Sequence, residues 1–118
     1  MTHEQTSLGR IAISTKAMAT IASQAALQSY GVVGMASKNF VDGIADLLVR
    51  DPRHSVDVKT ELGEILVDLY IIVEYGTRIA SVATSVANAV QYQLERAMGQ
   101  NVAAVNVHIQ GLRISNTD

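Results

Sequence analysis

The sequence predicts an α+β fold, a two-layer sandwich in which two long helices cover one face of a mixed four- to five-stranded sheet, in the order β-α-β-α-β-β-α-β. Two observations predict the sheet: in residues 65–75 and again in residues 102–114, side chains alternate so that one face is apolar and the other mixed. A third observation predicts the helices. Residues 16–29 and 77–98 carry apolar side chains at the three- and four-residue spacing of a buried helical stripe.

The chain opens with a predicted strand followed directly by a helix. Residues 9–13 alternate in strand fashion, and Ser14 or Thr15 then offers a side-chain oxygen that caps the amides of a helix start. The face of this helix that we expect to pack on the sheet consists of Met18, Ile21, Ala22 and Ala25. Gly31 is well placed to end the helix, because glycine adopts the left-handed backbone conformation without strain.

A short strand and a short helix come next. Residues 32–36 predict the second strand. Apolar residues then repeat at helical spacing over residues 40–48, and Asp51 followed by Pro52 ends this helix because proline disfavours helix at the preceding residue. Gly43 lowers the helical preference of the segment.

Two strands joined by a turn are predicted next along the chain. Residues 55–59 alternate, residues 60–64 form a turn, and the long strand follows, which together predict a β-hairpin. The uniformly apolar side of the long strand consists of Ile65, Val67, Leu69, Ile71, Val73 and Tyr75. We expect this side to face the helices.

The last helix and the last strand complete the two layers. Thr77 can cap the helix and Gly99 ends it. Its apolar stripe consists of Ile79, Val82, Ala83, Val86, Val90, Leu94 and Ala97. The final strand places Val105, Val107 and Ile109 on one side and three polar residues on the other.

Because both helices cover one sheet face, the opposite face is left open. This open face is predicted to display Asp68, Tyr70, Ile72, Glu74, Asn106, His108 and Gln110. The set is more apolar than a purely solvated surface requires, so we interpret it, or a sheet edge, as an interaction surface.

Composition favours a single self-associating domain. Charged residues make up only 17% of the 118 residues and apolar residues 48%, which predicts that part of the surface meets another copy. A net charge of −2 with scattered basic residues disfavours nucleic acid as a partner. The chain has no cysteine, so no disulfide framework is expected. Its amino end carries no apolar signal segment, and no apolar run reaches the roughly 20 residues that span a bilayer. We therefore expect that membrane association would require a partner.

No motif predicts catalysis, a metal or a cofactor. The three histidines lack the local spacing of zinc ligands, and Asp42 with Asp46 is better explained as the polar side of a helix than as an acid–base pair. Gly31 and Gly34 have the spacing of a KH-domain loop, but the residues between them are apolar and no basic cluster flanks them. A hydrolase triad and a glycine-rich phosphate loop are absent as sequence motifs.

The order of four blocks resembles the alkaline shock protein family of Gram-positive bacteria. These blocks are GRIAIS from residue 9, GVVGM from residue 31, DLYIIVEYG from residue 68 and VNVHIQG from residue 105. The resemblance implies a cytoplasmic, non-enzymatic protein of the envelope stress response that self-assembles and that, in some members, a separate anchoring protein holds at the membrane. Its domain would span residues 9–114, between a polar tail over residues 1–8 and a short tail over residues 115–118.

One alternative from another class stays open. Some short members of the family are encoded beside a kinase of the dihydroxyacetone or fatty-acid type, so the chain would be an accessory protein that binds such a kinase or a small apolar ligand. A deep apolar pocket between helices and sheet would favour this alternative, whereas a solid core would favour a scaffold.

Overall fold

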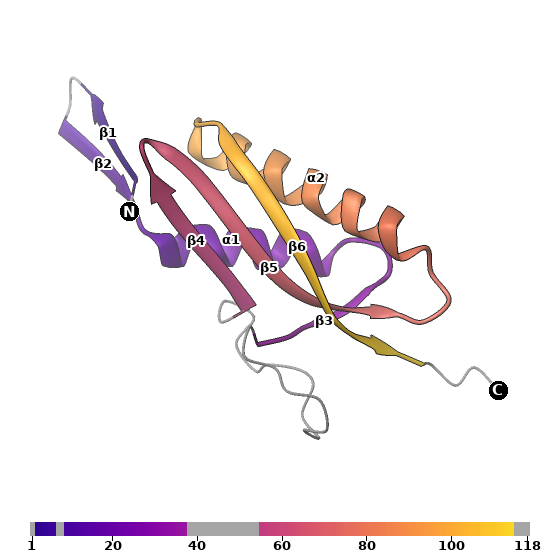
Figure 1. Cartoon of the computed structure of the whole chain (residues 1–118). Coiled ribbons are helices and arrows are strands. Elements are labelled where there is room, and N and C mark those ends of the chain that lie inside the picture. The colour runs from indigo at the N-terminus through magenta and orange to yellow at the C-terminus, as the bar shows by residue number, and fades with distance from the viewer. Residues whose placement is uncertain (1, 7–8, 38–54, 115–118) are drawn as a thin grey trace.

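The computed structural model describes residues 2–6, 9–37 and 55–114. Its elements, in chain order, are β1 (Thr2–Thr6), β2 (Gly9–Ile13), α1 (Thr15–Leu27), β3 (Val32–Met35), β4 (Val56–Glu61), β5 (Glu64–Glu74), α2 (Ile79–Met98) and β6 (Val102–Arg113). Both helices lie on one side of the main sheet, as predicted (Figure 1). The helix predicted over residues 40–48 lies outside the described residues.

The main sheet is built around β5. Along one edge, β5 pairs in parallel with β6, from Ile65 opposite Val102 to Glu74 opposite Arg113. Along the other edge, β3 and β4 both pair with β5 in the antiparallel direction. β3 pairs with the last residues of β5, and β4 pairs with the first residues of β5. β3 and β4 therefore follow one another along a single edge, and the sheet of four strands is mixed, as predicted.

The predicted hairpin is confirmed in β4 and β5. The two residues between these strands are Leu62 and Gly63, with φ angles of 51° and 79°. Positive φ at both central residues is typical of the tight hairpin turn whose twist matches that of the flanking strands. The turn sets the register in which Glu61 lies opposite Glu64.

The amino end differs from the prediction. Residues 9–13 form a strand, β2, but it pairs with β1 in a separate two-stranded sheet and not with the main sheet. Residues 1–8, expected as a polar tail, therefore contain a strand. Local pairing satisfies the backbone groups of β2 within the hairpin, which lies away from the main sheet (Figure 1).

The core fills the space between the helices and β5. Alternate residues of β5, from Ile65 to Val73, have exposed fractions of at most 1%. The small residues Ala22 and Ala26 of α1 are fully buried, and their size allows the helix to approach the sheet closely.

The buried row of α2 repeats every fourth residue and consists of Val82, Val86, Val90, Leu94 and Met98. Ile79, which we expected in this row, is 41% exposed, and Ala97 is also exposed. A single row spaced by four residues leaves these two positions at the helix ends turned away from the sheet.

The predicted helix ends are confirmed in part. Ser14 caps α1, its Oγ accepting a hydrogen bond from the Ala17 amide at 3.1 Å. Gly99 ends α2 in the left-handed conformation with φ 71°. The prediction that Thr77 caps α2 is wrong. Its hydroxyl donates to the Glu74 carbonyl at 2.7 Å, and the N-cap position falls on Arg78, which makes no side-chain capping bond.

Candidate functional site

Four of the predicted site residues lie next to one another on the sheet face opposite the helices. The parallel register of β5 and β6 sets Asp68 opposite Asn106 and Tyr70 opposite His108. Side chains that lie opposite one another on neighbouring strands point to the same face. We call Asp68, Tyr70, Asn106 and His108 the open-face cluster.

Two rings of the open-face cluster stack. The imidazole of His108 and the phenol ring of Tyr70 have centroids 4.6 Å apart and planes inclined by only 12°. Stacked aromatic pairs contribute about 0.5–1.5 kcal/mol beyond the area they bury. The two rings therefore hold each other in one orientation on the surface of the sheet.

The same imidazole also contacts a carboxylate. His108 Nε2 lies 3.0 Å from Asp68 Oδ1, and the exposed fractions of the two side chains are 43% and 21%. The hydrogen bond from His108 lowers the pKa of Asp68 below its ordinary value of 3.8, and a hydrogen bond from Asn106 and the positive charge of Lys59 lower it further, whereas burial acts in the opposite direction. Because an ionised carboxylate can only accept, the hydrogen bond to Asp68 requires a proton on His108 Nε2.

Two of the other predicted residues have different surroundings. The Gln110 amide donates to the Ser37 carbonyl at 3.4 Å, so its side chain reaches from β6 across β5 to the end of β3. Ile72, predicted to be displayed on the open face, is 1% exposed, and that expectation is wrong. The register of β6 shifts beside Ile72, so that Gly111 lies opposite it and the Ile72 Cγ1 atom comes within 3.9 Å of the position a Gly111 Cβ would take.

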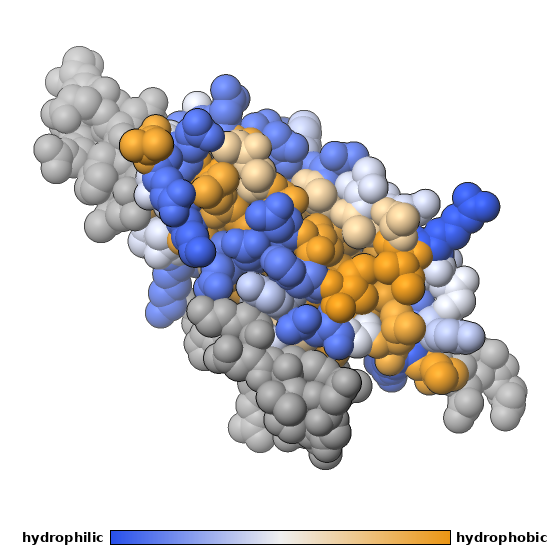
Figure 2. All heavy atoms as spheres, in the orientation of Figure 1, coloured by the Kyte–Doolittle hydropathy of each residue, from blue (hydrophilic) through white to orange (hydrophobic). Residues whose placement is uncertain are grey.

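The last predicted residue, Glu74, lies at the end of the face. It is half-buried and pairs with Arg113 in the register of β5 and β6, two positions beyond Ile72 and away from the open-face cluster. Figure 2 is drawn in the orientation of Figure 1 and shows that polar and apolar side chains share the surface on this side of the molecule. The structure thus gathers four of the seven predicted residues and separates the other three.

The open-face cluster combines two rings, a carboxylate and an amide on one face of the sheet. A histidine oriented by an aspartate also occurs in hydrolases, but there the second imidazole nitrogen activates a nucleophile. Here the ring of His108 lies flat against Tyr70. Within the described ranges, no three His, Asp or Glu side chains gather in a way that could hold a metal ion. Tyr70 is partly exposed on this face, and tyrosine is among the residues that are enriched where proteins contact one another.

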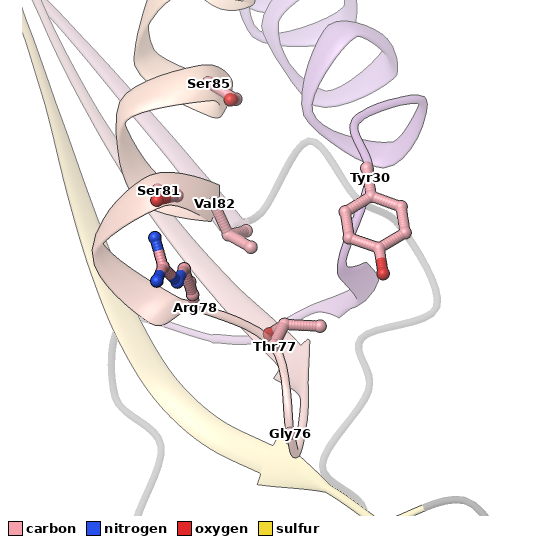
Figure 3. A pocket seen from close by; sticks show the side chains of 7 residues that line it. All are labelled: Tyr30, Gly76, Thr77, Arg78, Ser81, Val82 and Ser85. Carbon is pink, nitrogen blue, oxygen red and sulfur yellow. The ribbon is translucent and has the colours of Figure 1, made fainter.

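A pocket of about 370 Å³, which the sequence did not predict, lies where β5 turns into α2 (Figure 3). Its lining residues are Tyr30, Gly76, Thr77, Arg78, Ser81, Val82 and Ser85. Gly76, with φ 97°, makes the turn that brings Thr77 and Arg78 to the start of α2. Tyr30, 83% exposed, follows α1 and forms the other wall. The pocket is open to solvent, and its lining combines hydroxyl groups and one guanidinium with the apolar side chain of Val82.

The sequence held one signal for this region. Gly31 has φ 88°, and a Cβ added there would lie 2.7 Å from Val82 Cγ2, so glycine is needed for the segment after α1 to approach α2 closely. The prediction that Gly31 ends the first helix is wrong, because α1 ends at Leu27 with Gln28 as its C-cap; the contact of Gly31 with Val82 depends on the tertiary structure. Among the described helices, none is both long and apolar enough to cross a membrane.

Comparisons with known proteins agree with this fold. Residues 3–114 match the sequence model of the alkaline shock protein 23 family, described as having a cell envelope-related function. The uncharacterised protein YloU of Bacillus subtilis (strain 168) is 41% identical over 114 residues, which cover 95% of each chain. The uncharacterised protein Spy1614 of Streptococcus pyogenes serotype M6 is 33% identical over 109 residues, 90% of this chain and 89% of the relative. Among solved structures, the copper form of the MamM CTD aligns with a TM-score of 0.51 at 16% identity, covering 87% of this chain and 91% of that one, a likeness of fold alone.

Proposed function

The chain belongs to the alkaline shock protein 23 family, whose function is cell envelope-related, and from this premise we propose that it is a non-enzymatic interaction protein of the envelope stress response. In this proposal the protein self-associates through the sheet face opposite its helices or through a sheet edge, and it binds a partner through that face. The observation that carries the proposal is the open-face cluster, in which Tyr70, His108 and Asp68 hold one another in place on a face that neither helix covers.

The physical support is preorganisation. A side chain that is already fixed before binding loses little conformational entropy when a partner arrives. The stack of Tyr70 on His108 and the bond from His108 to Asp68 fix both rings, so these side chains can serve as a rigid centre of contact. The apolar residues on the same side of the molecule would add buried area around that centre (Figure 2).

The proposed setting is the cytoplasm, with a membrane-bound partner supplying any attachment to the membrane. The relation to a membrane is proposed from the family's envelope-related function. Under this proposal the protein acts by holding other proteins in place and needs no cofactor.

The alternative function, an accessory protein for a kinase or a small apolar ligand, would need either a cavity for the apolar ligand or a surface that binds the kinase. The described side chains between the helices and the sheet are shielded from solvent. Met18, Leu69, Val86 and Leu94 have exposed fractions of 0%. A packed core supports the scaffold proposal over a small apolar ligand, and a kinase partner becomes one outcome of the experiment.

The test is an affinity pull-down of the tagged full chain from cells of the organism that encodes it, with soluble and detergent-solubilised membrane fractions analysed separately by mass spectrometry. A double variant, Tyr70→Ala with His108→Ala, removes the stack. The matched control is Tyr92→Ala, which removes another exposed tyrosine, 56% exposed on α2.

We expect a specific membrane protein to be recovered with the wild type and with Tyr92→Ala and to be lost with the double variant. Equal recovery with all three proteins would show that the open face is not the contact surface. Recovery of a soluble kinase in place of a membrane protein would replace the scaffold proposal with the accessory function.

A further inference from the structure

The outer edge of β6 is the longest strand edge that the described residues leave without a partner strand. β6 has 12 residues and pairs with β5 alone. The backbone N–H and C=O groups along such an edge form a template on which a further strand can pair. The side chains of β6 determine which strand can pair with this edge.

The composition of β6 lacks the features that usually block edge pairing. Proteins protect exposed edges with charged side chains, with proline or by keeping the edge strand short. Residues 102–112 contain no charged side chain and no proline. β4, on the opposite edge, has 6 residues and carries Asp57, Lys59 and Glu61, so it is both short and charged. The two edges of the same sheet therefore differ in their capacity to pair.

The middle of β6 is also regular. Its register with β5 shifts beside Ala103 and beside Gln110, and between these two bulges residues 104–109 run without interruption. In that stretch Val105, Val107 and Ile109 pack against the core but remain only partly buried. Another strand placed alongside β6 would cover the apolar area that these three side chains still expose to water.

We propose that the edge of β6 pairs with β6 of a second copy of this chain, in antiparallel orientation about a two-fold axis that passes beside Val107. The proposal rests on the self-association included in the proposed function and adds its interface and register. In this register Val107 lies opposite Val107 of the other copy, Val105 opposite Ile109, and Asn106 opposite His108. Apolar side chains thus meet apolar ones on the helix side, and hydrogen-bonding side chains meet on the open face.

Neighbouring registers fit less well. A shift by one residue would set Asn106 opposite Val107 and would require the helices of the two copies to lie on opposite sides of the joined sheet. A shift that centres the axis on Asn106 sets Ala104 opposite His108, and one that centres it on His108 brings the two imidazoles together. Only the axis at Val107 matches each side chain from 105 to 109 with one of its own kind.

A second copy is favoured as the occupant because β6 is complementary to itself. A symmetric dimer about a two-fold axis requires a surface that matches its own rotated image, and this is the commonest arrangement of soluble homo-oligomers. Since residues 102–112 are uncharged, no charge repulsion arises between the two strands. The joined sheet would also set the two open-face clusters side by side, with His108 of each copy beside Asn106 of the other.

The chain contains no cysteine, so single introduced cysteines report cross-links without background. The test measures the mass of the wild-type full chain by light scattering during gel filtration and the cross-linking of single-cysteine variants by a short bis-maleimide. Val107→Cys places two thiols directly opposite one another, about 4.5–5.5 Å apart at Cβ. Asn106→Cys and His108→Cys are tested separately and as a mixture, and Lys59→Cys, an exposed position on the opposite edge, is the control.

We expect the wild type to be a dimer and Val107→Cys to form a covalent dimer. The mixture of Asn106→Cys with His108→Cys should cross-link several-fold faster than either variant alone, because the two positions are directly opposite only in the mixture. A dimer that cross-links no faster at position 107 than at position 59 would overturn the β6 interface but leave the proposed self-association in place. A monomeric wild type would overturn both, while partner recovery in the pull-down would still stand.

Discussion

The imidazole of His108 lies flat on the phenol ring of Tyr70, with ring centroids 4.6 Å apart and planes 12° apart. The contact forms because the parallel pairing of β5 with β6 sets these two residues directly opposite one another. The same imidazole reaches Asp68 at 3.0 Å. Three side chains from two strands thus hold one another on the sheet face that the helices leave uncovered.

The first prediction concerns the strength of this stack. We expect Tyr70→Ala and His108→Ala each to lower the free energy of unfolding by about 1 kcal/mol, and the pair to show a coupling energy of about 0.5–1 kcal/mol in a double-mutant cycle. The low end of the usual range is expected because His108 is 43% exposed. Urea denaturation of the four proteins measures the coupling. A cycle between His108 and Tyr92 is the control and should be additive, because α2 lies on the other side of the sheet.

The second prediction is a pH dependence that follows from Asp68. Its pKa is lowered in the folded state, chiefly by the hydrogen bond from His108. A carboxyl group with a lowered folded-state pKa binds fewer protons when folded, so its contribution to stability is complete above the ordinary value of 3.8 and is lost as the pH falls through the folded value. Asp68→Asn should therefore be less stable than the wild type at about pH 7 and should approach it on acidification toward about pH 3.

The measurement is the free energy of unfolding of both proteins across this pH range. The difference between them isolates Asp68 from the other carboxyl groups, which titrate in both. The difference between His108→Ala and Asp68→Asn combined with His108→Ala serves as the reference, because without the imidazole most of the lowering of the Asp68 pKa should disappear. A gap between wild type and Asp68→Asn that stays constant down to about pH 3 would contradict the assignment.

The faces of β5 and β6 could be predicted from the sequence, whereas the contacts between them could not. Alternation of side chains determines which residues share a face, so Asp68, Tyr70 and His108 were correctly placed together. The register was not predictable, because β6 is parallel to β5 and is reached through α2, and no local turn links the two strands. The stack and the bond to Asp68 depend on that register.

The main errors each have a local cause that residue pattern does not reveal. Ile72 follows the same alternation as Tyr70, yet it is buried at a register shift in β6 that alternation does not reveal. The strand Thr2–Thr6 was expected as a tail because its composition is polar, and only its pairing with β2 makes it a strand. Thr77 was a reasonable cap by residue type, but its hydroxyl donates to the nearby Glu74 carbonyl.

The third prediction concerns the approach of the chain after α1 to α2. Gly31→Ala places a side chain on a backbone with φ 88°, and its Cβ would lie 2.7 Å from Val82 Cγ2 in the core. We expect a loss of about 2–4 kcal/mol in the free energy of unfolding, from backbone strain together with overpacking. Thermal and urea denaturation measure this loss.

Gly63→Ala separates the two causes. Gly63 has φ 79°, but no atom lies within 4 Å of its added Cβ, so this variant carries the backbone strain alone, about 1–2 kcal/mol. Gly31→Ala combined with Val82→Ala should be less destabilised than the sum of the two single variants, since the shorter side chain makes room. Equal losses for Gly31→Ala and Gly63→Ala would show that the contact with Val82 has no energetic effect.

The last prediction concerns the joint between α2 and β6. The Val102 amide donates to Glu95 Oε2 at 2.9 Å, and the Gln91 side-chain amide donates to the Val102 carbonyl at 3.2 Å, so both backbone groups at the start of β6 are bonded to α2. Glu95→Ala leaves the partly buried Val102 amide without this acceptor, which should cost about 1–3 kcal/mol. Glu95→Gln keeps a side-chain oxygen at the same reach and should cost less, because only the charge is lost.

Gln93→Ala, exposed on the same helix, is the control and should stay within about 0.5 kcal/mol of the wild type. Amide hydrogen exchange tests the cause of this loss of stability. If the missing bond to Glu95 is responsible, exchange at the Val102 amide accelerates more in Glu95→Ala than in Glu95→Gln. A uniform acceleration along β6 would instead assign the loss of stability to the packing of α2.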